Sequence, residues 1–325
     1  SKIMMNCEYK KVYMWLLLMA FILEGCWDSS VDYRQIESST STSTSITATS
    51  VSAGGDHTCA VIPEGTLKCW GKEENGQLGN GLTSNSGQST PVSVSNISTA
   101  TSVSAGDAHT CAALSGGRVT CWGYGYYGQL GDGTTSNDST PVSVSSISTA
   151  TSVSAGDAHT CAVLSGGTVK CWGYGYHGRL GNGTGADVYG QYIFQTTPVS
   201  VDNISSATSV SAGGSHTCAV LSGGTVKCWG RGYYGQLGEG PRADRSTPVS
   251  VSGISTATSV SAGGLHTCAV LYGGTVKCWG YGNRGRLGIE LDSGTNNQPT
   301  PVSVTGISSA TSVSAGSHHT CAVLS

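Results

Sequence analysis

The fold is decided by residues 109–122, His-Thr-Cys-Ala-Ala-Leu-Ser-Gly-Gly-Arg-Val-Thr-Cys-Trp. Two short runs of mostly apolar and β-branched residues flank Ser115-Gly116-Gly117, which predicts two antiparallel strands joined by a three-residue loop. With a loop of this length, Cys111 lies directly opposite Cys121. Opposed residues of an antiparallel pair have Cα atoms about 4.5–5.5 Å apart, a separation that a disulfide accepts. The stretch therefore predicts a β-hairpin closed by a disulfide.

This hairpin recurs along the chain at intervals of roughly 50 residues, the spacing of stacked or radially arranged units. His-Thr-Cys begins at His57, His109, His159, His216, His266 and His319. In the first five copies a second cysteine stands ten residues after the first, which predicts five disulfides and hence an oxidising compartment. The predicted pairs are Cys59 with Cys69, Cys111 with Cys121, Cys161 with Cys171, Cys218 with Cys228, and Cys268 with Cys278.

Each copy also contains two further strand-like segments. In the second copy, residues 101–105 alternate with period two, and residues 140–144 form Thr-Pro-Val-Ser-Val, for which we expect Pro141 to stand at the strand start. Four short strands in a unit of about 50 residues are typical of a β-propeller blade. The chain contains five complete units and the first two strands of a sixth.

These motifs resemble the RCC1 (regulator of chromosome condensation) repeat. The resemblance covers residues 47–325 and rests on His-Thr-Cys-Ala-Val-Leu, Cys-Trp-Gly, Gly-Gln-Leu-Gly and Thr-Pro-Val-Ser-Val, with Arg179 and Arg286 replacing the glutamine in two copies. It implies an all-β, RCC1-like propeller of four-stranded blades. Because that family forms seven-bladed rings, we expect the present chain to be a truncated ring. The partner expected for Cys321 would stand ten residues further on, at a position that the sequence does not reach. We therefore interpret Cys321 as a further indication of truncation and less as a free reactive thiol.

The segment before the repeats predicts export. Lys10 and Lys11 precede an apolar run over residues 12–23, too short to span a bilayer but suited to a signal segment over residues 1–25. The junction that ends at Cys26 resembles a bacterial lipobox, which implies lipidation of Cys26; ordinary secretion, an uncleaved anchor or a cytosolic chain are the alternatives. Residues 26–46 are rich in Ser and Thr and predict a flexible tether. We therefore expect a cell-surface or outer-membrane lipoprotein, or a secreted protein.

Several functional classes are disfavoured. With 16 Lys and Arg against 19 Asp and Glu, the chain has no cationic surplus for binding nucleic acid. The repeated His and Cys lack the close cysteine spacing of structural zinc sites, and no phosphate-binding loop precedes a helix. Identical groups in every blade also argue against one catalytic centre. We expect no enzyme activity, no cofactor and no metal, with the histidines structural within each blade and the tryptophans packed between blades.

Binding residues are expected in the loops that vary between copies. The loops after Cys-Trp-Gly combine tyrosine with glycine and arginine, a composition that antibody paratopes favour. An insertion over residues 185–195 adds an aromatic tip in the third copy. The alternative is that the tyrosines pack over the neighbouring blade and that the insertion caps its own blade. The candidate residues are Tyr126, Tyr127, Tyr176, Tyr189, Tyr192, Phe194, Tyr233, Tyr234 and Arg284.

These inferences predict a non-catalytic propeller that binds a protein or glycan through its variable loops. Fold alone does not decide this, because RCC1-like proteins include a nuclear exchange factor, light sensors and a secreted β-lactamase inhibitor. One alternative is regulation or inhibition of an enzyme, with unlike polar groups clustered at the central opening. Guanine-nucleotide exchange is a further alternative by family analogy, and it requires reduced cysteines in the cell.

Overall fold

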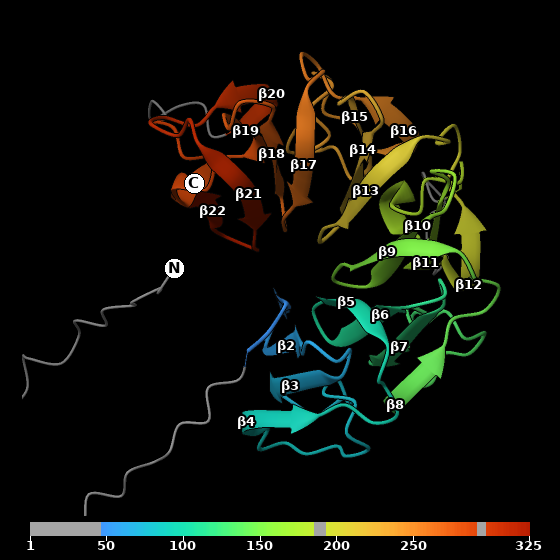
Figure 1. The fold of residues 1–325 in the computed structure, drawn as a ribbon. Helices are drawn as coiled ribbons and strands as arrows, with labels where there is room; N and C mark the ends of the chain where they lie inside the picture. Colours follow the sequence, from blue (N-terminus) through green and yellow to red (C-terminus); the bar gives the residue numbers. More distant parts are fainter. Residues whose placement is uncertain (1–46, 185–192, 291–296) are drawn as a thin grey trace, which may run out of the picture. The chain divides into compact units, whose positions relative to one another are not determined.

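Six antiparallel sheets follow one another along the chain in the computed structural model (Figure 1). The structure describes residues 47–184, 193–290 and 297–325, which belong to the compact unit Ile46–Ser325. The expected signal, Cys26, the whole tether, Tyr189 and Tyr192 lie outside the described residues. Within the described ranges, no helix is long and apolar enough to cross a bilayer.

Five sheets have four strands and the sixth has two, in the order in which they occur in the sequence. The first blade comprises β1 (Ser50–Ala53), β2 (His57–Val61), β3 (Leu67–Gly71) and β4 (Gln88–Ser93); the second β5 (Ala100–Ala105), β6 (His109–Leu114), β7 (Val119–Gly123) and β8 (Asp138–Ser143); the third β9 (Ala150–Ala155), β10 (His159–Leu164), β11 (Val169–Tyr174) and β12 (Phe194–Ser200). The fourth comprises β13 (Ala207–Ala212), β14 (His216–Leu221), β15 (Val226–Gly230) and β16 (Arg245–Ser250); the fifth β17 (Ala257–Ala262), β18 (His266–Leu271), β19 (Val276–Tyr281) and β20 (Asn297–Ser303). The last sheet contains β21 (Ala310–Ala315) and β22 (Thr320–Leu324), and two 3₁₀ turns, η1 (Tyr176–Gly178) and η2 (Asn283–Gly285), complete the described elements.

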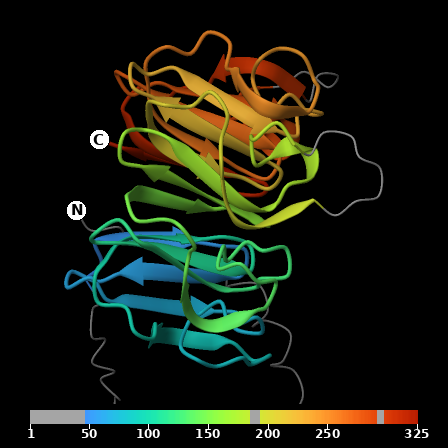
Figure 2. The same ribbon diagram turned by 90° about the vertical axis from the view of Figure 1, so that its right-hand side faces the viewer.

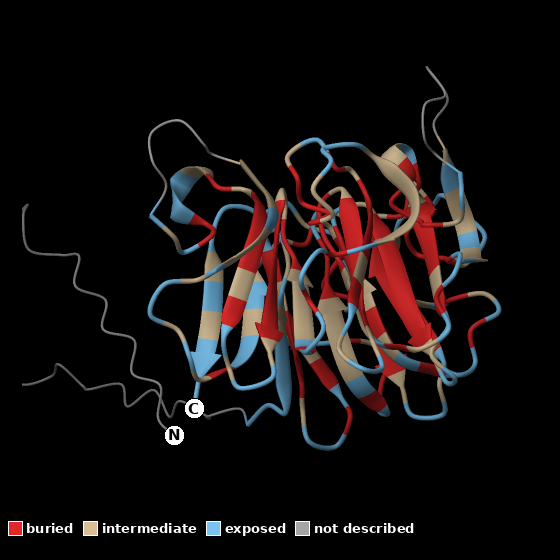
Figure 3. Cartoon of the chain, turned by 90° about the horizontal axis from the view of Figure 1, so that it is seen from above, coloured by how far each residue is buried: buried red, intermediate tan, exposed pale blue. Residues whose placement is uncertain are grey.

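The blades pack face to face around an arc, with the first strand of each blade innermost (Figures 1 and 2). The second strand of each blade contacts the first strand of the next, as β2 contacts β5 and β6 contacts β9. Buried residues concentrate in the strands between blades, and exposed residues concentrate in the loops (Figure 3). This arrangement confirms the predicted all-β propeller of four-stranded blades.

The hairpin register agrees with the sequence analysis. Cys111 lies opposite Cys121, and the equivalent cysteines face each other in the other four complete blades. All five pairs form disulfides whose Cα atoms are 4.1 Å apart, somewhat closer than the pairing alone predicts. The sulfurs lie inside the blades, where each cysteine residue has no exposed surface. Cys321 is free and exposed.

The fourth strand differs from the prediction. β8 begins at Asp138, so Pro141 stands inside the strand and not at its start. The ladder pairs Cys121 with Val142 and then Gly123 with Asp138, which leaves residues 139–141 in a bulge opposite a single residue of β7. A proline lacks a backbone N–H and is tolerated at such a bulge on an outer strand.

Tryptophan fills each interface between complete blades, as the sequence analysis predicts. Trp122 of the second blade is fully buried against Leu78, Val94 and Ile97 of the first. Trp172, Trp229 and Trp279 occupy the equivalent clusters. Gly79 has a positive φ of 69°, and a Cβ there would lie 2.6 Å from the Trp122 indole nitrogen. The glycine that ends Gly-Gln-Leu-Gly is therefore needed for both its backbone conformation and its close approach to the ring.

The repeated histidines link neighbouring blades, which corrects the expectation that they act within one blade. His57 Nε2 lies 2.7 Å from Thr110 Oγ1 of the next blade, and Thr110 Oγ1 donates to the carbonyl of Gln77 at 2.9 Å. Because the hydroxyl proton is used in that bond, His57 Nε2–H is the donor to Thr110. Equivalent bonds join His109 to Thr160 and the later blades in turn. The correction arises because only packing of one blade on the next brings the two side chains together.

Burial makes these histidines poor bases. It lowers the pKa of His57 and His266 to about 4 and that of His109 and His216 to about 3, and it places the pKa of His159 well below the usual value. Their Nδ1 atoms have no hydrogen-bond partner among the described residues. A second proton on the ring would therefore be buried without an acceptor.

We predict that acid destabilises the propeller. The folded pKa values lie below the unfolded value of about 6.5, so the unfolded chain binds protons first as the pH falls. The contribution of the neutral histidines to the free energy of unfolding is fully present well above pH 6.5. It declines as the pH falls, by about 2 kcal/mol per buried histidine between pH 6.5 and pH 5. Urea unfolding at several pH values measures the decline. His109→Gln, which keeps an amide donor but cannot titrate, should reduce the slope; an unchanged slope would contradict the assignment.

Candidate functional site

The loops at one end of the blades form a common surface. His109 pairs with Gly123, so β6 begins at the end of the sheet where β7 finishes. The inner loop before β6 (residues 106–108) and the outer loop after β7 (residues 124–137) therefore emerge together, and the hairpin turn lies at the opposite end. The other complete blades have the same register. We call the surface made by the inner and outer loops the loop face.

A continuous group of tyrosine rings crosses the loop face from the second blade to the third. We call it the tyrosine band, and it comprises Tyr124, Tyr126, Tyr127, Tyr174 and Tyr176. The ring centroids of Tyr127 and Tyr174 lie 4.7 Å apart across the interface between the two blades. Such pairs add stability beyond the area they bury and hold the rings in defined orientations.

A second aromatic group follows on the fourth and fifth blades. The rings of Tyr234 and Tyr281 lie 4.8 Å apart across that interface, and the Arg231 guanidinium lies 5.3 Å from the Tyr234 ring centroid. Between the two groups, His177 Nδ1 contacts the carboxylate of Asp244 at 2.5 Å. The outer loops of the second to fifth blades are therefore connected through their side chains.

The predicted tyrosines fall into two classes. Tyr127 and Tyr234 contact a tyrosine of the next blade and are half-buried, as the packing alternative expects. Tyr126, Tyr176 and Tyr233 are 59%, 45% and 63% exposed, which leaves a large part of each residue accessible. The loop face thus combines rigid aromatic supports with accessible aromatic surface.

Two further predicted residues are not members of the band. Arg284 is exposed on η2, where it adopts a positive φ of 66°. Phe194 does not form a loop tip: it is the first residue of β12, pairs with Tyr174 and is 37% exposed. The strand extends this far because its ladder resumes beyond a bulge, which the sequence pattern does not reveal.

Beside the tyrosine band, the structure gathers a group of residues that sequence reasoning missed. A pocket of about 340 Å³ is lined by the inner loops of the first three blades and the outer loops of the first two. Its charged and polar members include Asp56, Lys72, Glu74, Asp107, Asp157, Gln77 and Gln129, together with Tyr124 and Tyr127. The available signal was an aspartate one or two residues before His-Thr-Cys in the first three copies, absent from the later ones. We call this the acidic pocket. No cluster of metal-ligating side chains occurs among the residues described.

Each outer loop has either Gln or Arg immediately before its Leu-Gly, which we call the Gln-or-Arg position. The two residue types differ in whether the side chain bonds to the inner loop of the next blade. Arg179 is buried, donates from its guanidinium to the carbonyl of Gly214 at 2.8 Å, and lies 5.0 Å from the Tyr174 ring centroid. Burial lowers the pKa of Arg179 to about 10, so the group stays cationic at neutral pH. Gln129 is shorter: its Oε1 accepts from the Tyr127 N–H at 2.9 Å, and its Nε2 has no hydrogen-bond partner within the described part of the chain.

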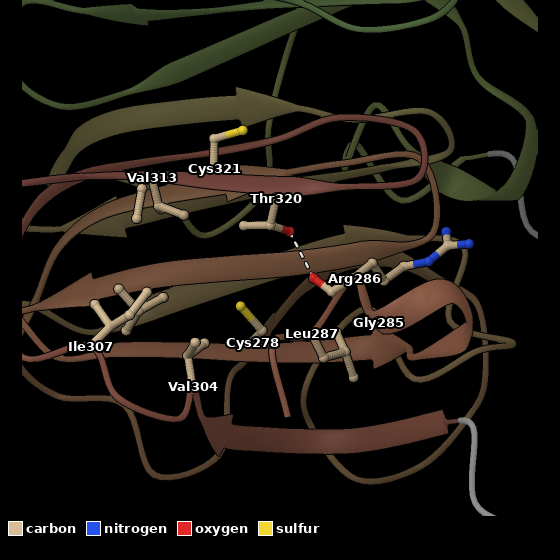
Figure 4. A pocket seen from close by; sticks show the side chains of 12 residues that line it. Cys278, Gly285, Arg286, Leu287, Val304, Ile307, Val313, Thr320 and Cys321 are labelled. Carbon is tan, nitrogen blue, oxygen red and sulfur yellow. Dashed lines mark hydrogen bonds between the residues drawn. The ribbon is translucent and has the colours of Figure 1, made fainter. Parts of the chain in front are cut away.

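A second, apolar pocket lies between the fifth blade and the two-stranded sheet (Figure 4). Leu287, Val304, Ile307 and Val313 line its space of about 140 Å³, and Thr320 Oγ1 donates to the carbonyl of Arg286 at 2.8 Å. Of the blade interfaces described, this one contains no tryptophan. The pocket therefore continues the core between blades and contains no grouping suited to chemistry.

Comparison with known proteins agrees with this architecture. The family model of the RCC1-like domain matches residues 26–323. The chain belongs to the RCC1-like family. The ultraviolet-B receptor UVR8 of Arabidopsis thaliana is 37% identical over 83 residues, which cover 26% of this RCC1-like chain and 19% of the receptor. The mitochondrial RCC1 domain-containing protein RUG3 of the same plant is 36% identical over 88 residues, 27% of this chain and 20% of that protein. The match thus spans about a fifth of each relative.

Solved structures share the RCC1-like fold. Human WBSCR16 superposes with a TM-score of 0.74 at 22% identity, covering 85% of this chain and 71% of that one. Prp20p of Saccharomyces cerevisiae gives a TM-score of 0.70 at 20% identity, covering 85% of this chain and 68% of that one. At such identities the similarity shows the fold alone.

We predict a graded effect of substitutions at Arg179. Arg179→Ala should lower the free energy of unfolding by about 2–3 kcal/mol, because the buried Gly214 carbonyl loses a charged donor. Arg179→Gln should cost less, since glutamine at this position accepts a backbone N–H as Gln129 does. Urea denaturation distinguishes the two variants, and an equal loss in both would refute the proposed equivalence of the Arg and Gln copies.

Proposed function

We propose that this RCC1-like propeller is a non-catalytic module that binds a protein through the loop face. The observation that carries the proposal is the exposure of Tyr126, Tyr176 and Tyr233 on loops that the neighbouring blades hold in place. Tyrosine provides a large contact area with few rotatable bonds, so little entropy is lost when a partner covers it.

Relatives with the same fold support a protein as the partner. Prp20p is described with binding properties toward Gsp1p and histones, and yeast RCC1 (Prp20) has been crystallised bound to Kap60. A glycan is the other ligand compatible with an aromatic surface. The acidic pocket favours a protein, because its carboxylates match a cationic side chain, whereas a neutral sugar would leave their negative charge uncompensated.

A matched pair of surfaces tests this proposal. Tyr126→Ser, Tyr176→Ser and Tyr233→Ser in one variant should abolish proximity cross-linking to partner proteins in native extract, because the accessible aromatic contacts are removed. Tyr272 is 84% exposed at a hairpin turn on the opposite end, so Tyr272→Ser is the control that should retain the partners. Equal capture by both variants would refute the site, and loss of glycan-array binding alone would replace the protein by a glycan.

We also propose that the chain acts outside the cytosol, anchored through a lipid on Cys26 or secreted. The five disulfides inside the blades support an oxidising compartment. The expected location would exclude a cytosolic GTPase as the partner.

The redox state of the cysteines tests the compartment. Protein isolated from its native cells and alkylated without reductant should carry no label on Cys111 or Cys121, because their sulfurs are bonded to each other. The protein is denatured before alkylation, so that a free thiol inside a blade would also react, and a sample that is reduced first and should carry label on both cysteines is the control. Labelled Cys111 and Cys121 in the unreduced sample would contradict the proposed export.

A second candidate function is regulation of an enzyme, which would then be the partner that the propeller binds. The observation that favours this is the acidic pocket, a cluster of unlike polar groups formed by inner and outer loops together. Adding the purified propeller to captured partners and measuring their turnover would decide between simple binding and regulation.

A further inference from the structure

The repeats supply an internal comparison for the acidic pocket. In both copies that have arginine before Leu-Gly, the guanidinium occupies the same place. Arg179 lies 5.0 Å from the Tyr174 ring centroid and donates to Gly214 O, while Arg286 lies 4.9 Å from that of Tyr281 and donates to Ser317 O. The guanidinium is thus placed beside a tyrosine of its own outer loop and bonded to the inner loop of the next blade.

The second blade has the same surroundings without the arginine. Tyr124 stands where Tyr174 and Tyr281 stand, and the shorter Gln129 replaces the arginine. Asp157 occupies the inner-loop position of the guanidinium acceptors Gly214 and Ser317. Tyr124, Gln129 and Asp157 all line the acidic pocket. The pocket therefore contains the space that an arginine side chain fills in two other copies.

Gln129 is 1% exposed, and its Nε2 is a buried donor without a hydrogen-bond partner among the described residues. Gln236 also has an unpaired Nε2, but of these two glutamines it is Gln129 that lines the acidic pocket and so places an unpaired donor there. A buried polar group without a partner costs free energy, which an acceptor on a ligand would recover. Because a cationic side chain has no acceptor, the backbone carbonyl of a peptide is the group that fits this donor.

The charge around the pocket is unbalanced. Lys72 forms salt bridges with Glu74 at 2.7 Å and with Asp56 at 3.7 Å. The carboxylates of Asp107 and Asp157 form none with the described residues. Partial desolvation and the nearby charge of Asp107 raise the pKa of Asp157, although its side chain is exposed. A cation in the pocket would relieve both effects.

The other glutamine copies lack this combination. In the first blade Lys72 replaces the tyrosine, and in the fourth blade Arg231 replaces it. The inner loop that follows Gln236 carries Gly264 where Asp157 stands. Among the complete blades, the second is the one that combines tyrosine, glutamine and a facing aspartate.

We propose that the acidic pocket receives an arginine side chain of a partner protein, which takes the place that Arg179 and Arg286 occupy in their own blades. The proposal rests on the proposed function and names the partner's chemistry. Arginine fits better than lysine because its planar guanidinium stacks on an aromatic ring and offers several donors to Asp107 and Asp157 at once.

Short peptides test the pocket directly. The probe is acetyl-Gly-Arg-Gly-amide, and its matched control contains citrulline, which keeps the planar shape but lacks the charge. Saturation-transfer NMR with the full chain should give a dissociation constant on the order of 1 mM for the arginine peptide. The citrulline peptide should bind at least about tenfold more weakly, because the charge-assisted contacts are lost. Equal binding of the two peptides, or no binding of either, would overturn the proposal.

Substitutions locate the bound arginine. Gln129→Arg should abolish peptide binding, because the protein's own guanidinium would fill the pocket as Arg179 does in the third blade. Gln236→Arg, the same change beside a loop without aspartate, is the control and should leave binding unchanged. Asp157→Asn should weaken binding about fivefold. Binding that survives Gln129→Arg would place the site elsewhere.

The outcome is separable from that of the proposed function. If the tyrosine variant loses its partners while the arginine peptide does not bind the wild-type chain, the loop face remains an interface and the arginine pocket is rejected. If the peptide binds but the tyrosine variant keeps its partners, the pocket is retained and the tyrosine interface is rejected.

Discussion

The packing of one blade on the next depends on one backbone carbonyl in the outer loop of each of the first four blades. The carbonyl of Gln77 accepts hydrogen bonds from both Thr110 Oγ1 and Trp122 Nε1 of the next blade, each at 2.9 Å, while His57 supports Thr110 from the other side. Gln129, Arg179 and Gln236 accept the same pair of bonds in their blades. These bonds are shielded from water, so losing any of them would leave a buried polar group unpaired. The five complete blades are thereby held to one another by polar contacts as well as by the buried tryptophans.

In this arrangement, backbone carbonyls make the bonds between blades, whereas the groups that vary between copies are side chains. Because the backbone carbonyl of the Gln-or-Arg residue accepts the bonds from the threonine and the tryptophan of the next blade, those two bonds form with either side chain at this position. The adjoining loop positions vary as well, from Lys72 to Tyr124 and Arg231, on backbone that two blades hold in place. A rigid loop with changeable side chains is the arrangement that binding surfaces require, because little order has to be acquired when a partner arrives.

Under the proposed function, the aromatic and acidic parts of the loop face would contribute to partner binding in different ways. Exposed rings such as Tyr126 would provide contact area, and the charged pocket would give orientation and exclude partners that lack the matching charge. The acidic pocket lies mainly on the first two blades and the tyrosine band on the second and third, while the later outer loops contain more arginine. Sequence repetition therefore coexists with a surface that is different at each blade.

Local pairing was determined by the sequence alone. The three-residue turn at Ser115-Gly116-Gly117 sets which residues face each other, so the register and the five cysteine pairs followed from spacing, and the tryptophans followed from their repetition. Contacts between blades were decided only by the tertiary structure. His57 reaches Thr110 across 53 positions in the sequence, and Asp157 joins Tyr124 and Gln129 in one pocket, because packing brings loops of successive blades together. A repeating sequence shows what each blade is made of, but the distances between side chains of different blades depend on how the blades stack, and that is a property of the folded arc.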